Sequence, residues 1–166
     1  MRLARFSALS CALACAGLFA CEQNKDPVTH FSDTDAEMIA ATEKARRTTP
    51  LFIKFLQAPQ RGQKYFTVKK AFPAASGGRE HIWVADVRLE NGVFHGRVEN
   101  IPADVPGLKL GDPASVPVGE ITDWMFLQNG EIEGGFTSRV EWARATPQER
   151  KARYPNIRFR PEPAMP

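Results

Sequence analysis

Cysteine is scarce in this sequence of 166 residues, and all three cysteines lie within the first 21 positions. The rest of the chain therefore forms no internal disulfide, and its fold depends on a hydrophobic core. No apolar run reaches the ~20 residues that a membrane-spanning helix needs. Histidine is also scarce, and His30, His81 and His95 lack the spacing of a metal site. We expect no cofactor and no metal.

The first 20 residues resemble the signal of a bacterial lipoprotein. Two arginines precede an uncharged apolar segment over residues 6–20, as an export signal requires. The motif Leu18-Phe19-Ala20-Cys21 matches a lipobox, which predicts cleavage before Cys21 and lipidation of its sulfur. The alternative is cleavage by ordinary signal peptidase, which would leave a soluble periplasmic protein.

Nothing in the charge balance argues for a nucleic-acid partner, and we expect none. Residues 1–20 contain two arginines and no acidic residue, so their removal lowers the formal net charge from +3 to +1. We expect the partners to be the membrane, through the lipid on Cys21, and an envelope protein or a small ligand. Glu22 replaces the Asp of an inner-membrane retention signal, which favours the outer membrane. Basic residues gather between positions 144 and 160, and we interpret them as a solvated face; the alternative is contact with anionic lipid.

Composition divides the chain into four segments. We expect a signal peptide over residues 1–20 and a polar tether over 21–33. A single domain should follow over residues 34–154, and a proline-rich tail, ordered only in part, over 155–166.

The domain is predicted to begin with a helix. Thr34 and Glu37 have the spacing of a capping box, and Pro50 either kinks this helix or starts a second one. Residues 136–144 fit a strand or, preferably, a helix, and Thr146-Pro147-Gln148-Glu149 opens another.

Between these helices the apolar pattern has a period of two residues, which is typical of strands. Asn91-Gly92 and Asn129-Gly130 predict two tight hairpins. The expected fold class is α+β: a bent, half-barrel-like antiparallel sheet of five to seven strands, with an N-terminal helix and short C-terminal helices. The predicted strands cover residues 65–73, 80–89, 93–99, 114–118, 120–127 and 131–133.

A series of short motifs lies between residues 36 and 140. They are Phe66-Thr67-Val68-Lys69, Gly77-Gly78-Arg79-Glu80-His81-Ile82-Trp83-Val84, Gly96, Asn100-Ile101-Pro102, Leu110-Gly111-Asp112, Ile121-Thr122-Asp123-Trp124 and Gly134-Gly135-Phe136-Thr137-Ser138-Arg139. Together these motifs resemble the YegJ-like bacterial domain, the DUF2314 family. That family carries a label of unknown function, so the resemblance supports the domain boundaries and implies no catalytic residue or ligand.

His81 is the first candidate for chemistry. In a strand it shares a face with Trp83, Ala85, Val87 and Leu89, so it lies at the end of an apolar face. We interpret it as a hydrogen-bonded imidazole at the edge of the core. The alternative is an acid–base or ligand-binding histidine.

Asp123 is the second candidate. Alternation places it on one face with Ile121 and Met125, where an ionised carboxylate needs a partner. Plausible partners are His81, Lys69 and Arg139. We favour a buried structural ion pair over an Asp–His catalytic pair, because the sequence has no Gly-x-Ser-x-Gly nucleophile elbow.

Several other residues are candidates for ligand binding. Gly134 and Gly135, followed by Arg139, suit a turn with positive φ; the alternative is an anion site at a helix that begins at Thr137. From these patterns we expect a lipid-anchored envelope protein that binds a protein or a small polar ligand without catalysis. The alternative is a hydrolytic envelope enzyme that uses His81 and Asp123. The ligand-binding candidates are Glu80, Trp83, Trp124, Arg139 and Lys69.

Overall fold

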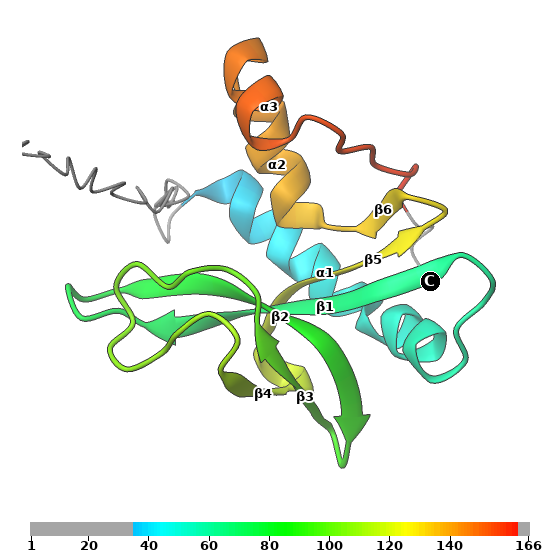
Figure 1. Cartoon of the computed structure of the whole chain (residues 1–166), viewed down its shortest axis with the longest axis horizontal. Coiled ribbons are helices and arrows are strands. Elements are labelled where there is room, and N and C mark those ends of the chain that lie inside the picture. The colour runs from blue at the N-terminus through cyan, green and yellow to red at the C-terminus, as the bar shows by residue number, and fades with distance from the viewer. Residues whose placement is uncertain (1–34, 163–166) are drawn as a thin grey trace, which may run out of the picture.

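The computed structural model describes residues 35–162 and folds them around one six-stranded antiparallel sheet (Figure 1). The strand order is β4-β3-β2-β1-β5-β6, and the α+β prediction is confirmed. The predicted signal and the whole of the predicted tether, with Cys21, lie outside the described residues. The elements are α1 (Ala36–Gln57), β1 (Gln63–Pro73), β2 (Arg79–Glu90), β3 (Val93–Val98), β4 (Pro113–Pro117), the 3₁₀ turn η1 (Val118–Glu120), β5 (Ile121–Gln128), β6 (Glu131–Gly134), α2 (Phe136–Arg144) and α3 (Pro147–Arg153).

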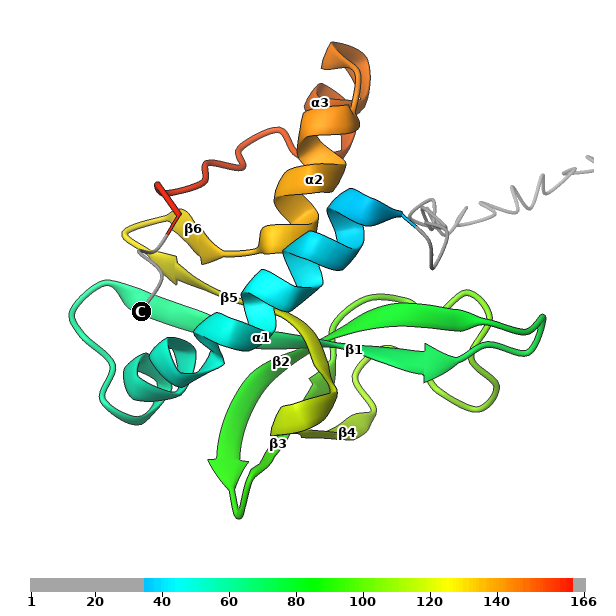
Figure 2. The same ribbon diagram turned by 180° about the vertical axis from the view of Figure 1, so that it is seen from behind.

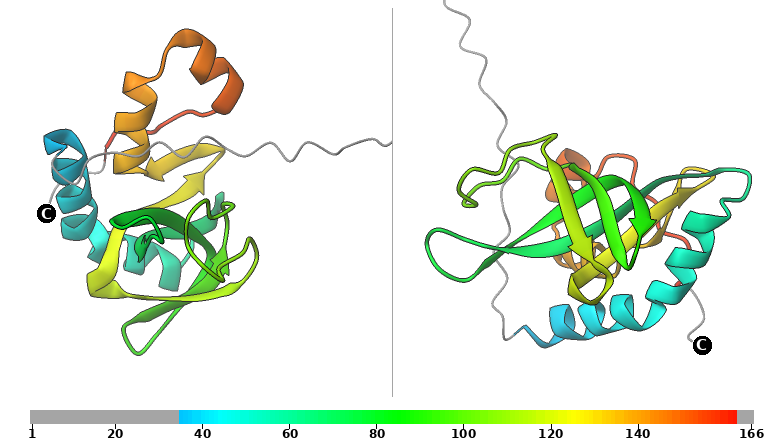
Figure 3. Two further views of the ribbon diagram at one scale, coloured as in Figure 1. Left: turned by 90° about the vertical axis from the view of Figure 1, so that its left-hand side faces the viewer. Right: turned by 90° about the horizontal axis from the view of Figure 1, so that it is seen from below.

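The helices cover the two faces of the sheet unequally. Seen from behind, α1 runs across the sheet and contacts mainly β5, while α2 and α3 lie towards the end of the sheet formed by β5 and β6 (Figure 2). Among the described residues no helix runs along the opposite face of β1 and β2 (Figure 3), and the contact there with α2 is made by Lys69, which reaches Thr137 and Glu141. Between residues 35 and 162, no helix combines the length and apolar character needed to cross a bilayer.

Helix α1 begins one residue later than predicted. Asp35 is the N-cap, and its Oδ1 accepts hydrogen bonds from the backbone N–H groups of Glu37 (3.1 Å) and Met38 (3.2 Å). The predicted Thr34–Glu37 capping box is therefore wrong, since Asp is an equally good cap and stands next to Ala36. Thr34 itself lies outside the described residues.

Pro50 lies inside α1 and does not end it. The helix continues for seven more residues to Gln57. Proline has no N–H to donate to the Arg46 carbonyl, four residues earlier, so one helical hydrogen bond is lost. The hydroxyls of Thr48 and Thr49 donate to the carbonyls of Lys44 and Ala45 in the same turn, with 3.0 Å between Thr49 Oγ1 and the Ala45 oxygen. The buried face of α1 packs on the sheet through Phe52, which maintains the helix despite the lost bond.

The core lies between α1 and the sheet and is dominated by aromatic rings. Phe52 of α1 is fully buried, with its ring centroid 5.3 Å from Trp124, 5.9 Å from Phe66 and 5.7 Å from Phe94. The indole Nε1 of Trp124 donates to the Ala45 carbonyl oxygen at 3.0 Å. Burial of these rings supplies much of the stability, at roughly 1.5–3 kcal/mol each.

The two Asn-Gly pairs form the predicted hairpins. Asn91 and Gly92 have φ values of 50° and 78°, and Asn129 and Gly130 have 54° and 86°. Two consecutive positive φ angles define the turn whose twist matches that of the flanking strands. These turns fix the β2–β3 and β5–β6 registers.

Strand β2 contains an extra residue that changes which side chains face the core. Its register with β3 shifts between positions 85 and 88, and Asp86 there has a φ of 52°. The extra residue reverses the alternation, so Val87 is buried like Val84. The predicted single apolar face over residues 81–89 is therefore wrong.

A second shift, between Lys69 and Lys70 in the pairing of β1 with β5, has the same effect. It places Ile121 in the core cluster on the α1 side. The prediction that Ile121 shares a face with Asp123 is wrong for this reason.

The proline-rich tail, expected to be ordered only in part, is fixed to β6 as far as it is described. Ile132 of β6 donates its N–H to the Arg158 carbonyl at 2.8 Å and accepts from the Arg160 N–H at 2.9 Å. Phe159 forms a parallel bridge with Ile132. The tail therefore covers the open edge of β6.

Candidate functional site

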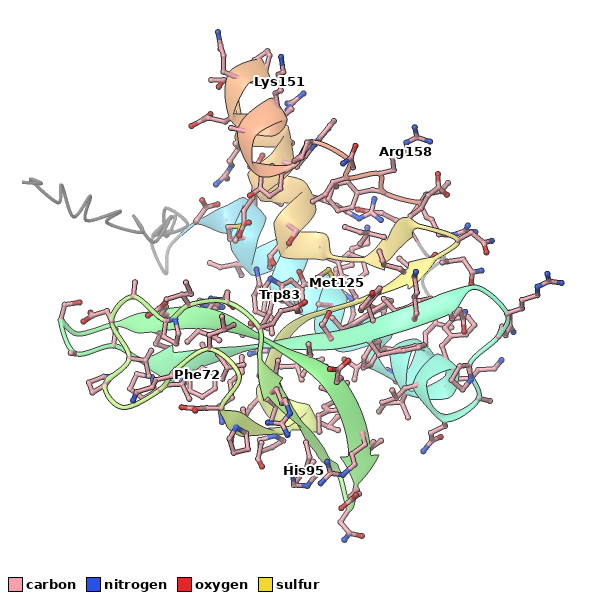
Figure 4. The ribbon with its side chains drawn as sticks, viewed as in Figure 1. Phe72, Trp83, His95, Met125, Lys151 and Arg158 are labelled. Atoms are coloured by element: carbon pink, nitrogen blue, oxygen red, sulfur yellow. The ribbon has the colours of Figure 1, made fainter. Side chains whose placement is uncertain are left out.

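Three candidate side chains from neighbouring strands form one row on the face opposite α1. Lys69 of β1 is the register partner of Trp83 in β2 and of Asp123 in β5. Figure 4 labels Trp83, which lies below α2 in that view. The strand register therefore brings Lys69, Trp83 and Asp123 together.

Asp123 lies in a strand but caps helix α2. Its Oδ1 accepts from the backbone N–H groups of Trp124 (2.8 Å) and Phe136 (3.1 Å), and its Oδ2 accepts from the N–H (2.8 Å) and the hydroxyl (2.5 Å) of Thr137. Gly135, at the N-cap position, has no side chain to do this. A carboxylate here satisfies free N–H groups and stabilises the positive end of the helix dipole.

Lys69 is the second buried charge of the site, with only 4% of its surface exposed. Its Nζ donates to Thr137 Oγ1 at 2.8 Å and lies 3.6 Å from Oε1 of Glu141. The same ammonium is 4.6 Å from the ring centroid of Trp83. Lys69 is thus balanced by two carboxylates, and the Thr137 hydroxyl links it to Asp123.

The surroundings of Asp123 act on the pKa of its carboxyl in opposite directions. Complete burial raises the pKa of its carboxyl, while the charge of Lys69 and the hydrogen bonds from Thr137 and Trp124 oppose this rise. Each carboxylate oxygen already accepts two hydrogen bonds, which fills the acceptor capacity of the group. Asp123 therefore accepts no substrate proton unless α2 loses its cap. The role of Asp123 is therefore structural, and its contact with Lys69 runs through the Thr137 hydroxyl, while the direct ion pair of Lys69 is with Glu141.

The double glycine before α2 forms a turn, as preferred from the sequence. Gly134 and Gly135 have φ values of 78° and 64°. A Cβ on Gly134 would lie 2.4 Å from the Trp124 carbonyl oxygen, so only glycine fits there. The helix starts at Phe136, one residue before the start assumed for an anion site. Its first N–H groups bind Asp123, which occupies the place of an external anion.

His81 does not form a pair with Asp123. It is exposed on β2, and its Nδ1 lies 3.0 Å from the hydroxyl of Thr122. The four hydrogen bonds of Asp123 come from Trp124 and α2 instead. The arrangement required for His–Asp acid–base catalysis is absent from these contacts.

Glu80 of β2 has a structural role, because it holds the loop between β3 and β4. It is 3% exposed, and its two carboxylate oxygens accept the N–H groups of Ala103 and Asp104, each at 2.8 Å. Asn100 adds a further contact, because its Oδ1 accepts the Trp83 N–H at 2.7 Å. Glu80 therefore fixes the loop between β3 and β4 to strand β2.

The remaining two candidates lie away from the row. Trp124 points into the core on the α1 side of the sheet. Arg139 donates to the carbonyls of Gly134 (2.8 Å) and Arg160 (2.8 Å), and its guanidinium lies 4.7 Å from the Phe159 ring centroid. Burial lowers the pKa of Arg139, while Glu162 and other nearby acids oppose this. Arg139 therefore joins α2 to the tail.

Thr137 and Glu141 are the site residues that sequence reasoning missed. Their spacing of four positions places them on one face of α2, which was the available signal. In the part of the chain that the structure describes, no cluster of three His, Cys, Asp or Glu side chains could hold a metal, and no buried side-chain nitrogen or oxygen lacks a partner. A shallow cleft of about 280 Å³ lies elsewhere, lined by Arg46, Thr49, Pro50, Ile53, Val118 and Gly119.

The sequence model of one bacterial family matches residues 35–156, which include the whole sheet and all three helices. Its description is "Uncharacterized protein conserved in bacteria (DUF2314)". The chain belongs to this DUF2314 family. The match includes every residue of the Lys69–Asp123–Thr137 cluster, so this cluster is part of the DUF2314 domain.

Two relatives extend the comparison. The protein YegJ of Escherichia coli K12 is 34% identical over 101 residues, which cover 60% of this chain and 63% of YegJ. A protein of Neisseria meningitidis serogroup B, named as an ankyrin repeat protein, is 29% identical over 130 residues, or 74% of this chain and 51% of that protein. The chain thus spans between half and two thirds of these relatives. No solved structure gives a significant match.

Proposed function

We propose that this chain is a lipid-anchored protein of the bacterial cell envelope whose DUF2314 domain is a non-catalytic binding module. The anchor is supported by the lipobox Leu18-Phe19-Ala20-Cys21 and the apolar segment before it. Two or three acyl chains on Cys21 would suffice for stable attachment, whereas one chain would not.

The observation that carries the non-catalytic assignment is the use of Asp123 as a helix cap. The carboxylate that a hydrolytic mechanism would need holds the first turn of α2 through both oxygens. His81 faces Thr122 instead. The rival hypothesis of a hydrolase based on these two residues therefore has no supporting geometry.

The Neisseria relative offers a second, weaker support for binding. It is named as an ankyrin repeat protein, and this chain aligns with 51% of its length. Repeat proteins of this kind present extended concave surfaces that bind other molecules. A domain that occurs in such a protein fits a role in assembly better than a role in metabolism.

Metabolic labelling with a palmitate analogue tests the anchor. We expect the wild-type chain to take up label and to sediment with membranes, and Cys21→Ser to lose both properties. Cys15→Ser is the matched control, because position 15 does not end the lipobox, and it should label normally. Loss of label in Cys15→Ser but not in Cys21→Ser would contradict the assignment.

His81→Asn tests the domain's role without removing the cap of α2. Envelope fractions would be assayed with generic ester, amide and phosphoester substrates, and the purified domain with thermal-shift ligand sets. We expect His81→Asn to leave every turnover unchanged. A turnover lost in this variant at an unchanged melting temperature would favour the hydrolase.

A further inference from the structure

Exposed aliphatic side chains gather at one end of the molecule. Among the described residues, four large hydrophobic side chains are exposed: Ile39, Tyr65, Ile101 and Leu110. Ile39 lies near the start of α1, and the other two aliphatic residues lie in the loop between β3 and β4. Figures 1 and 2 show the start of α1 and this loop on the same side of the molecule, whereas β1, with Tyr65, begins at the opposite end.

The loop that carries Ile101 and Leu110 is held firmly. The buried carboxylate of Glu80 binds two of its N–H groups, and Asp104 accepts the Ser76 N–H at 2.9 Å from the β1–β2 hairpin. The Gly111 N–H donates to the Val98 carbonyl at 2.8 Å, which draws the two ends of the loop together. Little conformational entropy would therefore be lost when this surface meets a partner.

The loop lies on the side of the domain from which the chain leads back to the predicted lipidation site. The described domain starts at Asp35, on the side that carries the loop, and the chain leads from there back to Cys21. Fourteen residues extend at most about 50 Å, so a lipid on Cys21 keeps the domain within that distance of the bilayer. A short tether corresponds to a millimolar effective concentration, at which weak contacts become occupied.

We propose that this end of the domain is a membrane-facing surface, with Ile101 and Leu110 inserting among the lipid headgroups and upper acyl chains. The proposal rests on the lipid anchor of the proposed function. Aliphatic side chains at the interface gain by leaving water, and the exposed Lys109 beside Leu110 can extend to an anionic headgroup. Docking would give the domain one orientation on the membrane and leave the Tyr65 end directed away.

Single-cysteine labelling tests this orientation, because the chain has no cysteine after position 21. The chain from residue 21 onward, with Cys21→Ser and an N-terminal hexahistidine tag, would be attached to phosphatidylethanolamine–phosphatidylglycerol vesicles that contain a nickel-chelating lipid. Ile101→Cys, Leu110→Cys and Tyr65→Cys would each carry an environment-sensitive fluorophore. Tyr65 is the control, because it is also an exposed large hydrophobic side chain and lies at the far end.

We expect the emission of the fluorophores at 101 and 110 to shift to the blue on vesicles, and we expect both fluorophores to be quenched by headgroup-region spin labels. The fluorophore at 65 should not change. Equal behaviour at all three positions would overturn the proposal, as would shielding that needs an added envelope protein. The tag replaces the lipid, so this result is independent of acylation at Cys21, which the palmitate experiment tests separately.

Discussion

At the scale of single residues, the buried charges of this domain connect its parts to one another. Asp123 holds α2, Lys69 binds Thr137 and Glu141, and Glu80 holds the β3–β4 loop. A buried ion pair contributes little net stability over an apolar pair, but loss of one partner is costly. We therefore expect these residues to be sensitive to substitution for structural reasons.

Asp123→Ala should lower the free energy of unfolding by about 3–5 kcal/mol, because α2 would lose its cap and the buried Lys69 would lose a nearby negative charge. Asp123→Asn should also destabilise, since the amide NH₂ would face N–H donors at whichever oxygen it replaces. Urea unfolding measures both effects. Thr137→Val, which keeps the backbone N–H and removes only the hydroxyl, should cost about 1–2 kcal/mol. Equal losses in Asp123→Asn and Thr137→Val would contradict the capping role.

Glu99 offers a prediction about titration. Partial burial raises the pKa of its carboxyl, and the nearby charge of Asp86 adds to this rise. Asp86→Asn should therefore lower the pKa of Glu99, and Asn tolerates the positive φ at position 86. Carbon-13 NMR titration of the glutamate carboxyls measures the change. An unchanged Glu99 pKa in Asp86→Asn would contradict the contribution of Asp86 and leave burial as the cause of the rise.

At the scale of elements, the start of α1 is joined to the end of α2. The Arg144 guanidinium binds both Asp35 and Glu37, with 2.8 Å between its Nη2 and Oδ1 of Asp35. This hydrogen bond is the main reason that the pKa of Asp35 falls from 3.8 to about 2. Because the folded pKa is below the unfolded one, the contribution to stability is present above pH 3.8 and is lost as the pH falls towards 2.

Asp35→Asn separates the ion pair from the helix cap. Asn caps a helix as well as Asp does, so this variant loses the charge of the ion pair and keeps the cap, whereas Asp35→Ala loses both. Thermal melts should show Asp35→Asn below the wild type at pH 6, with the difference shrinking as the pH approaches about 2. Asp35→Ala should melt lower at every pH. A constant gap between wild type and Asp35→Asn would contradict the ion-pair assignment.

Local patterns predicted the elements well. Period-two alternation located the strands, the Asn-Gly pairs gave the hairpins, and Thr146 with Glu149 forms the expected capping box of α3. These features depend on residues near in sequence. The proposed start of α1 failed because Thr34 and Asp35 are adjacent competing caps, which a pattern cannot rank.

The candidate site was harder to predict, because it depends on contacts distant in sequence. A bulge reverses the alternation of side chains between the two faces of a strand. The extra residue at Asp86 therefore made the predicted face of β2 wrong. The Lys69–Thr137 contact joins positions 68 residues apart and requires the β1–β5 register to be known. The sequence could thus name Lys69 as a partner of Asp123 but could not choose it over His81 or Arg139.

At the scale of the whole molecule, both edges of the sheet are protected. Pro113 and Pro117 lie at the two ends of β4 and offer no N–H to another strand. The tail covers β6 at the other edge, through Ile132. Strand addition is therefore disfavoured at both edges, which directs recognition to loops and faces.

Truncation after Asn156 should expose the β6 edge. We expect a lower melting temperature and self-association that increases with concentration, measured by light scattering after size exclusion. Removal of residues 163–166 alone is the control, because the β6 contacts of Phe159 and Arg160 remain. A monomeric product at high concentration would show that the tail is not needed to protect β6.

The capping of α2 from a strand also constrains the order in which the chain folds. A helix of nine residues is too short to persist alone in water, and its stabilising carboxylate belongs to β5 rather than to its own N-cap. The ammonium that accompanies this carboxylate comes from β1. Helix α2 should consequently consolidate only after β1 and β5 have paired, so that substitutions in α2 accelerate unfolding while those at the β1–β5 pairing slow the folding rate.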